Sequence, residues 1–148
     1  DAYHMSSPEP HGKGAEGAIR RALSNANLTP DEIDYLNLHG TGTPQNDAAE
    51  CEAVYRVFGD KVLVSSTKPL TGHTLGAAGI TDALLAILTL CSPVTLPAQL
   101  RDSTKIDPQL ATVNWVKKAT RVAPKRVMSN NFAFGGNNTS LIFGSIQD

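Results

Sequence analysis

The chain has 148 residues, of which 41% are hydrophobic and 18% are charged, and its formal net charge is −1. This length suits about one domain, able to bury roughly two-thirds of its unfolded surface. The balanced charge gives no reason to expect nucleic acid or an anionic membrane as a partner. The two cysteines, Cys51 and Cys91, fit neither a metal site nor a disulfide framework, which favours a reducing compartment and a cytoplasmic location.

The first twelve residues, DAYHMSSPEPHG, have a loop-like composition and lack an initiator methionine. Apolar residues at helical spacing then predict an amphipathic helix over residues 15–26. The run IDYLNLH (33–39) predicts a short strand that ends at His39. We expect residues 1–148 to be a piece of a longer protein, because a domain rarely starts with such a segment.

The second helix is predicted to begin at the pair Thr43-Pro44, which looks like an N-cap followed by proline at the first helical position. Its apolar pattern continues to about Phe58, where Gly-Asp follows. The apolar run 62–66 then predicts a buried strand that leads to Lys68.

A nearly all-apolar helix is predicted from about Thr74 to Cys91. It is too short for a membrane span of ~20 residues and contains Asp82, so a helix buried in the core is favoured. The segment VTLPAQL and the twenty residues after it are rich in loop formers, with Trp115 expected to pack against the core.

The last two predicted strands, RVMSNNF (126–132) and TSLIFGSI (139–146), flank a glycine-containing turn and suggest an antiparallel hairpin. Helices and strands therefore alternate, which predicts a layered α/β domain with a mixed sheet and a central buried helix. The loops that carry His39, Lys68, His73 and Phe134 each lie next to a predicted strand end, so they could converge on one side of the sheet.

Two histidines stand in glycine- and threonine-rich turns, His39 in LNLHGTGTP and His73 in STKPLTGHTLGAAG. Two neutral imidazoles that donate Nε2–H to one oxygen make an oxyanion hole, in which losing one donor typically costs ~3–4 kcal/mol. Lys68, five residues before His73, favours neutral histidines because like charges repel. This pattern suits an enolate or thioester oxyanion better than acid–base hydrolysis.

Other polar residues surround this pair in the sequence. Glu50 is a candidate counter-ion for Lys68, or alternatively a solvated charge on a helix face. Thr41 and Thr43 place hydroxyls beside the first histidine, where they suit an amide-bearing arm, although Thr43 is also a candidate helix cap. The stretch FAFGG offers the backbone N–H of Phe134 as a second oxyanion donor and flexible glycines as a gate.

Two other kinds of site are less favoured. His39, His73 and Glu50 could ligate zinc, but their spacing matches no zinc signature and the adjacent lysine would repel a metal, so no metal is predicted. The run GHTLGAAG could cradle a phosphate, but it fits neither phosphate-binding glycine motif, so close helix packing is the better explanation. Cys51 and Cys91 are interpreted as small buried hydrophobes rather than nucleophiles.

Three blocks together, HGTGTPQND followed by Glu50, SSTKPLTGHTLGAAG and SNNFAFGGNN, resemble the C-terminal part of the β-ketoacyl-acyl carrier protein synthases. These are condensing enzymes of fatty-acid and related polyketide synthesis in the thiolase superfamily, and the second block is closer to the elongating fatty-acid synthases. The resemblance extends almost to the C-terminus. It implies a thiolase-like fold, a layered α/β/α arrangement with a mixed five-stranded sheet and a buried central helix.

The resemblance also implies a reaction, the decarboxylative Claisen condensation of an acyl thioester with malonyl-carrier protein. His39 and His73 match the catalytic pair, Lys68 matches the lysine of the second block, and Glu50 matches the acidic residue linked to that lysine. Phe134 matches the gating phenylalanine. Substrate-binding positions are matched by Thr41 and Thr43, which would hold the phosphopantetheine arm, and by Ser6, Gly135 and Gly136.

Partners and cofactors follow from the same resemblance. It implies an acyl carrier protein as partner and a homodimer or a condensing-enzyme heterodimer, with no nucleic acid, membrane, metal or nucleotide cofactor, since phosphopantetheine arrives on the carrier protein. The family's nucleophilic cysteine lies in the N-terminal half, so this chain alone is expected to be inactive. The alternatives are a non-catalytic chain-length partner subunit and a thiolase-superfamily acyltransferase that does not use malonyl donors.

The gate departs from the common family form FGFGGTN. Ala133 replaces a glycine and narrows the backbone freedom of a loop that must move, and Asn137 replaces a threonine and alters the polar anchoring of that loop. Our hypothesis is that this variant marks an unusual acyl substrate, such as a polyunsaturated or aryl-capped chain.

Overall fold

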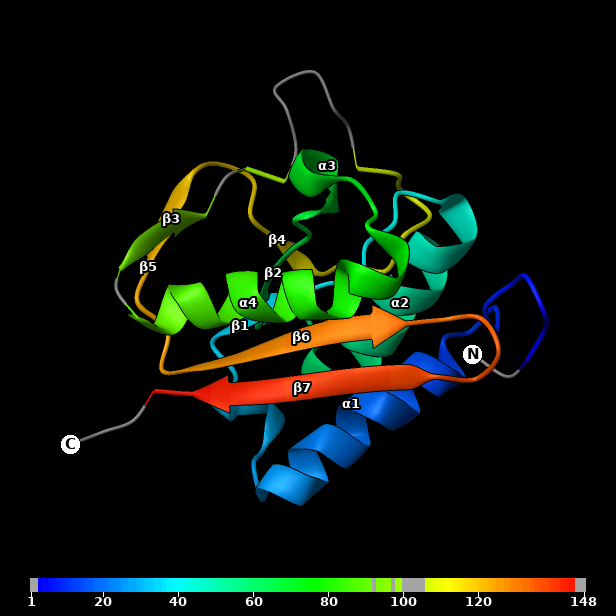
Figure 1. The fold of residues 1–148 in the computed structure, drawn as a ribbon, viewed down its shortest axis with the longest axis horizontal. Coiled ribbons are helices and arrows are strands. Elements are labelled where there is room, and N and C mark those ends of the chain that lie inside the picture. The colour runs from blue at the N-terminus through cyan, green and yellow to red at the C-terminus, as the bar shows by residue number, and fades with distance from the viewer. Residues whose placement is uncertain (1–2, 92, 97, 100–105, 146–148) are drawn as a thin grey trace.

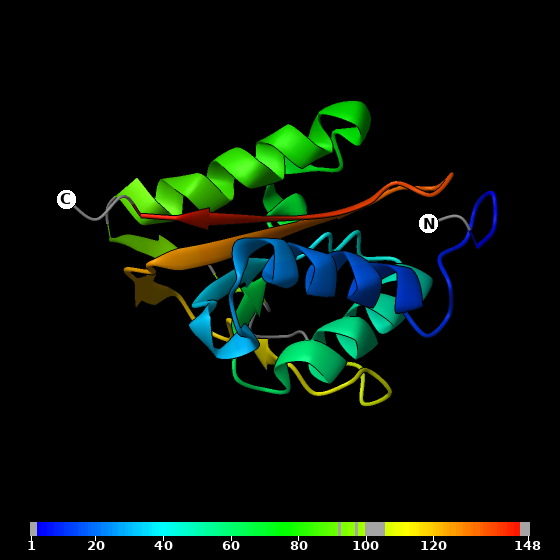
Figure 2. The ribbon, with the colours of Figure 1, turned by 90° about the horizontal axis from the view of Figure 1, so that it is seen from below.

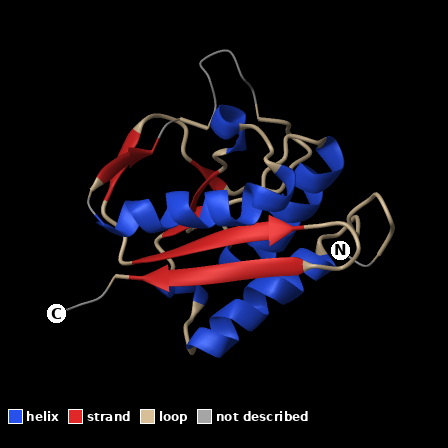
Figure 3. Ribbon diagram, in the orientation of Figure 1, coloured by secondary structure: helices blue, strands red, loops and turns tan. Residues whose placement is uncertain are grey.

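The computed structural model describes residues 3–91, 93–96, 98–99 and 106–145 (Figure 1). Its helices and short 3-10 turns alternate with strands, as Figure 3 shows by colour. In chain order the elements are α1 (Lys13–Ala26), η1 (Pro30–Glu32), β1 (Tyr35–Asn37), α2 (Pro44–Phe58), β2 (Leu63–Ser65), α3 (Lys68–Thr71), η2 (Leu75–Ala77), α4 (Ala78–Cys91), β3 (Val94–Leu96), β4 (Asn114–Trp115), β5 (Thr120–Val122), β6 (Arg126–Phe132) and β7 (Asn138–Gly144).

The main sheet has five strands in the order β4-β2-β1-β6-β7. Strands β4, β2, β1 and β6 are parallel, whereas β7 is antiparallel to β6, so the sheet is mixed. A separate antiparallel pair joins β3 and β5. The carboxyl ends of β1, β2 and β6 therefore lie at one edge, where the loops that follow them can build a site.

Helices cover both faces of this sheet, with α1 and α2 on one side and α4 on the other (Figure 2). The core between the sheet and α1 and α2 contains fully buried side chains from both layers, including Ile19, Leu36, Val54, Val64 and Met128. The predicted layered α/β/α arrangement and mixed five-stranded sheet are confirmed.

The first two predicted helices and the hairpin agree closely with the structure. Helix α1 begins two residues before the predicted start, after Gly12 in a left-handed conformation (φ 66°). A Cβ there would lie 2.0 Å from the carbonyl oxygen of Ala49, so only glycine fits between α1 and α2. Helix α2 runs over Pro44–Phe58, and Trp115 packs against the core as expected.

The loop-rich region contains more structure than the sequence indicated. It holds the two- and three-residue strands β3, β4 and β5, which are too short to produce a clear alternating pattern. The one-turn helix α3 was also not predicted. Residues 97 and 100–105 of this region, and residue 146 of the last predicted strand, lie outside the described residues.

Helix α4 is buried on one face only, which corrects the prediction of a fully buried helix. Ala83 and Ala86 pack inward, whereas Ile80, Leu84 and Leu88 are 62%, 53% and 55% exposed. The exposed residues are four positions apart and so share one helix face. An all-apolar helix sequence does not show whether other elements of the same chain cover both faces of the helix.

Cys91, at the end of α4, is likewise exposed rather than buried, because it lies at the open end of that helix. Within the described part of the chain, no helix has the length and apolarity needed to cross a membrane.

Candidate active site

A cleft of about 740 Å³ opens at the carboxyl edge of the sheet. Its walls come from the N-terminal segment, the loop after β1, the turn after α3 and the β6–β7 turn. Among the residues that line it are six predicted from the sequence: Ser6, His39, Thr41, Thr43, His73 and Phe134. The structure thus brings together positions that are up to 128 residues apart, from Ser6 to Phe134.

The other four predicted residues do not line the cleft. Lys68 and Glu50 are buried behind it, at 6% and 2% exposure. Gly135 and Gly136 lie in the β6–β7 turn with positive φ angles of 85° and 107°, which suits their predicted place in a mobile gate.

The two histidines both line the cleft and meet edge to face. Their ring centroids are 5.4 Å apart with an interplanar angle of 87°. The backbone N–H of Leu75 donates to Nδ1 of His73 at 3.2 Å, so Nδ1 acts as the acceptor and the ring presents its N–H through Nε2.

His39 is 6% exposed, and its pKa is lowered to about 3. Burial is the main cause, followed by the positive charge of Lys68 and the neighbouring His73. The predicted effect of Lys68 on this histidine is therefore present but secondary. His39 is neutral at pH 7 and can serve as an N–H donor rather than as a cation.

The counter-ion of Lys68 is Asp82, which corrects the prediction that Glu50 plays this part. Lys68 Nζ lies 2.6 Å from Asp82 Oδ2, and the hydroxyl of Thr67 donates to Asp82 Oδ1 at 3.0 Å. Both charged side chains are less than 5% exposed. A lone acid in an otherwise apolar helix was the sequence signal for such a buried pair, because an ionised carboxylate inside a protein needs a partner.

Glu50 instead holds the loop that presents His39. Its carboxylate accepts the backbone N–H groups of His39 and Gly40, both at 2.8 Å, and the side-chain amide of Asn130 at 3.3 Å. Burial raises the pKa of Glu50 to about 7 despite these hydrogen bonds. The alternative of a solvated helix-face charge is wrong. The carboxylate is also committed to backbone donors, which leaves it unsuited to a zinc site.

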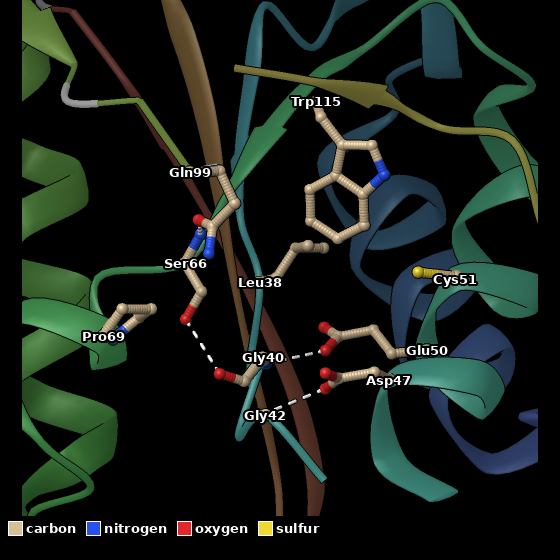
Figure 4. A pocket seen from close by; sticks show the side chains of 10 residues that line it. All are labelled: Leu38, Gly40, Gly42, Asp47, Glu50, Cys51, Ser66, Pro69, Gln99 and Trp115. Carbon is tan, nitrogen blue, oxygen red and sulfur yellow. Dashed lines mark hydrogen bonds between the residues drawn. The ribbon is translucent and has the colours of Figure 1, made fainter. Parts of the chain in front are cut away.

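The loop after β1 turns sharply where it lines a second, smaller cavity of about 70 Å³ (Figure 4). Gly40 has φ 42°, and a Cβ on it would lie 2.5 Å from the Cβ of Ser66, so the turn requires glycine. The Ser66 hydroxyl donates to the Gly40 carbonyl at 3.1 Å, and Asp47 accepts the Gly42 N–H at 3.3 Å. These contacts fix the direction in which His39 and Thr41 leave the sheet.

The two threonine hydroxyls are hydrogen-bonded to one another at 3.1 Å beside the cleft. Thr43 occupies the N-cap position of α2, as its sequence pattern indicated, but its side chain makes no capping hydrogen bond. Its hydroxyl therefore faces the same space as that of Thr41 rather than the helix end.

Both cysteines belong to the described residues, and neither lines the cleft. Cys51 is buried beside the small cavity, where burial raises the pKa of its thiol to about 12 (Figure 4). A thiol with a raised pKa is a poor nucleophile. No group of three or more His, Cys, Asp and Glu side chains in the described segments could hold a metal ion.

The sequence did not single out two asparagines on β6 as parts of the site. Asn130 binds Glu50, and Asn131 lines the cleft next to His39. Their sequence signal was the block SNNFAFGGNN, in which the polar pair directly precedes the gate sequence.

A known protein family matches the part of the chain that carries most of these residues. Residues 1–100 match the family described as "Beta-ketoacyl synthase, C-terminal domain". The matched range contains both histidines, Lys68 and Glu50, while the β6–β7 turn lies beyond it.

Two curated relatives are similar over essentially the whole chain. The 3-oxoacyl-[acyl-carrier-protein] synthase 2 of Vibrio harveyi is 40% identical over 100% of this chain and 36% of its own length. The mitochondrial 3-oxoacyl-[acyl-carrier-protein] synthase of Arabidopsis thaliana is 41% identical over 99% of this chain and 32% of its own length. The chain therefore spans about a third of the length of these curated relatives.

Solved structures show the same likeness. A ketosynthase from Xenorhabdus doucetiae, in complex with its chain length factor, aligns with a TM-score of 0.92 and 49% identity over 97% of this chain and 36% of the matched chain. A β-ketoacyl synthase from Burkholderia phymatum aligns with a TM-score of 0.89 and 38% identity over 99% of this chain and 35% of the matched chain.

Proposed function

Because this chain belongs to the β-ketoacyl synthase family, as its C-terminal domain, we propose that it supplies the two-histidine half of the active site of a β-ketoacyl-acyl carrier protein synthase. The observation that carries the proposal is the edge-to-face pair His39 and His73 in one cleft. His39 is kept neutral by burial and by Lys68, and His73 presents its N–H through Nε2. An N–H donor on each of the two rings suits an oxygen that gains negative charge during the reaction.

The proposed reaction is a decarboxylative Claisen condensation. The malonyl thioester loses its carboxylate as CO2, and the electron pair of the broken C–C bond moves into an enolate whose oxygen accepts hydrogen bonds from the two imidazoles. The enolate carbon then attacks the carbonyl of an acyl thioester, forming the new C–C bond and expelling the enzyme's thiolate. A neutral imidazole is the better donor here, because an imidazolium would risk protonating the enolate.

The nucleophilic thiolate must come from outside this chain, since neither Cys51 nor Cys91 lines the cleft. On this proposal a cysteine elsewhere in the complete protein takes the acyl group before condensation. The hydroxyls of Thr41, Thr43 and Ser6 would contact the amide-bearing arm of the carrier protein. Phe134, which is 61% exposed at the mouth of the cleft, would act as the gate.

The decarboxylation of malonyl-carrier protein tests this proposal. In the full-length protein, His73→Ala should lower the decarboxylation rate by about 10²–10³-fold, the loss typical of one oxyanion donor. Tyr55→Phe is a suitable control, because Tyr55 is half-exposed on α2 and does not line the cleft. An unchanged rate in His73→Ala would refute the assignment, and β-ketoacyl product from residues 1–148 alone would refute the external cysteine.

A chain-length partner subunit is the second candidate. It is supported by the similar ketosynthase structures that are described together with a chain length factor. Retention of both histidines and of the Lys68–Asp82 pair favours the catalytic subunit, because a subunit that only shapes a tunnel does not need them. The residue at the nucleophile position of the complete protein distinguishes the two, cysteine for the synthase and another residue for the partner.

The acyl substrate we propose is an unusual chain, polyunsaturated or aryl-capped. The two departures from the common gate sequence, Ala133 and Asn137, both line the cleft and so are placed to contact a substrate. The Ala133 N–H also donates to the Asn137 carbonyl at 3.0 Å, which closes the gate turn. A chain-length assay with a preference for ordinary saturated acyl groups would refute this part of the proposal.

We further propose an acyl carrier protein and a second condensing-enzyme subunit as partners, either an identical copy or a chain-length subunit, and a cytoplasmic location. The support is the family membership and the structures of related ketosynthases described with a chain length factor or an acyl-carrier protein. Crosslinking of the full-length protein to a carrier protein that bears a reactive phosphopantetheine analogue tests the first partner.

A further inference from the structure

Ser66 stands directly after β2, where β1 and β2 diverge. Just before this point the Leu38 N–H donates to the Ser65 carbonyl at 2.8 Å, as in a parallel ladder. One residue further on, the Ser66 hydroxyl donates to the Gly40 carbonyl at 3.1 Å, so a side chain continues the ladder by one contact. The same hydroxyl oxygen accepts the Lys68 N–H at 3.3 Å, at the first residue of α3.

One hydroxyl therefore ties together two loops that build the cleft. The Gly40 carbonyl belongs to the loop that presents His39, and α3 leads directly to the turn that carries His73. The Gly40 N–H is held by Glu50 at 2.8 Å, which lies on the other side of the turn from Ser66 (Figure 4). Because both polar groups of Gly40 are bonded, its left-handed backbone (φ 42°) has a fixed orientation relative to β2.

Gln99 holds the backbone of Ser66. Its side-chain Oε1 accepts the Ser66 N–H at 2.5 Å, and both residues line the small cavity (Figure 4). Gln99 is itself anchored, because its backbone N–H donates to the Val116 carbonyl at 2.7 Å, and the Val116 N–H donates to the Val64 carbonyl of β2 at 3.0 Å. Gln99 therefore reaches the end of β2 from a segment that is fixed beside β4.

We propose that Gln99 is a positioning residue that orients Ser66, whose hydroxyl then holds the His39 loop and the start of α3 at a fixed separation. Neither Gln99 nor Ser66 lines the cleft, so both act only through the loops that they hold. The catalytic consequence rests on the proposed function, because two rings whose centroids are 5.4 Å apart serve one developing oxyanion only while they keep that separation. The hydrogen bonds themselves do not depend on that function.

Nitrogen-15 NMR of the full-length protein, labelled at its serines, tests the hydrogen bond between Gln99 and Ser66. The Ser66 amide signal is assigned by its loss in Ser66→Ala. In the wild type this amide proton should resonate downfield of a solvated one and should exchange slowly with solvent. A rapidly exchanging Ser66 amide would overturn the proposal, and that measurement requires no folded variant of Gln99.

Gln99→Met provides the perturbation. Methionine has nearly the length of glutamine, but its thioether is only a weak acceptor, so the Ser66 amide should move upfield and exchange faster. Gln109→Met is the matched control, because Gln109 is exposed and lines neither the cleft nor the small cavity, so the Ser66 amide should keep its shift there. An unchanged Ser66 amide in folded Gln99→Met would refute the orienting role.

Activity tests whether this hydrogen bonding positions the histidines. In the full-length enzyme, Gln99→Met should lower kcat for malonyl decarboxylation by about 10²-fold, the loss that a displacement of about 1 Å causes, while KM stays nearly unchanged. Ser66→Ala removes the hydroxyl that Gln99 orients, so adding Gln99→Met to it should lower kcat little further. Fully additive losses in the double variant would contradict an action through Ser66.

Two outcomes separate this inference from the proposed function. If Gln99→Met changes the Ser66 amide while the wild-type protein has no decarboxylase activity, the orientation of Ser66 by Gln99 stands and the proposed function fails. If the wild type is active and Gln99→Met keeps its kcat, the proposed function stands and the positioning role is overturned.

Discussion

Replacing Glu50 by glutamine should change how the stability of the chain depends on pH. The Glu50 carboxyl is buried and has a pKa of about 7, against an ordinary value of 4.5. Between these two pH values the folded protein binds a proton that the unfolded chain has released. Wild-type stability attributable to this group is therefore highest below pH 4.5 and is lost as the pH rises to about 7.

The size of the effect follows from the same two values. At about 1.4 kcal/mol per pH unit, the interval between 4.5 and 7 corresponds to about 3 kcal/mol. Glutamine resembles the protonated carboxyl, with one acceptor oxygen and one donor group, so Glu50→Gln should have nearly wild-type stability at pH 4.5. At pH 8 the variant should have gained about 3 kcal/mol relative to the wild type.

The measurement is urea unfolding of both proteins at intervals from pH 4 to pH 8.5, with the difference in unfolding free energy plotted against pH. The difference is needed because His39, with its pKa lowered to about 3, contributes stability that rises with pH from about 3 to its ordinary 6.5. Both proteins keep His39, so its contribution largely cancels. Equal m-values would show that both unfold from similarly compact states. A difference that is flat across this range would refute the assignment of a raised pKa to Glu50.

The remaining predictions concern the buried ion pair, the histidine pair and the core. Asp82→Asn should destabilise the chain by about 3–5 kcal/mol in urea unfolding, because it leaves the Lys68 ammonium buried without its partner. The double variant Lys68→Met with Asp82→Leu should recover most of that loss. A destabilisation of the double variant equal to the sum for Lys68→Met and Asp82→Leu alone would contradict the pairing. In full-length protein, His73→Gln should lower malonyl decarboxylation while leaving the unfolding midpoint close to wild type, since this side chain is exposed. Leu36→Ala should cost about 2–5 kcal/mol because Leu36 is fully buried, whereas Leu84→Ala, at 53% exposure, should cost less than about 1 kcal/mol, and equal losses would contradict the one-sided burial of α4.

Local sequence signals determined much of this protein. The helix from Pro44 to Phe58 follows from its proline and its apolar spacing, and the β6–β7 hairpin follows from two β-prone runs around a glycine turn. The histidine motifs also identified the family, because their residue types and spacing can be read directly from the sequence, without the fold. The order of parallel strands then accounts for the meeting of His39 and His73 at one edge.

The partners of buried charges were decided only by the tertiary structure. Glu50 and Asp82 are both acids on predicted helices, and the sequence favoured the wrong one as the counter-ion of Lys68. Which acid reaches the lysine depends on how α4 and α2 lie on opposite faces of the sheet, and no local pattern encodes that placement (Figure 2). The same holds for Asn131, whose place beside His39 is set by the strand register.

The exposed face of α4 shows the same division between sequence and structure. The sequence predicts a nearly all-apolar helix that contains Ile80, Leu84 and Leu88. Whether that face is covered depends on which other elements the chain brings to it, and in this chain none of the described elements does. Local propensity and spacing therefore specify elements and motifs, whereas burial and ion pairing depend on contacts between segments far apart in the sequence, and only the folded structure reveals these contacts.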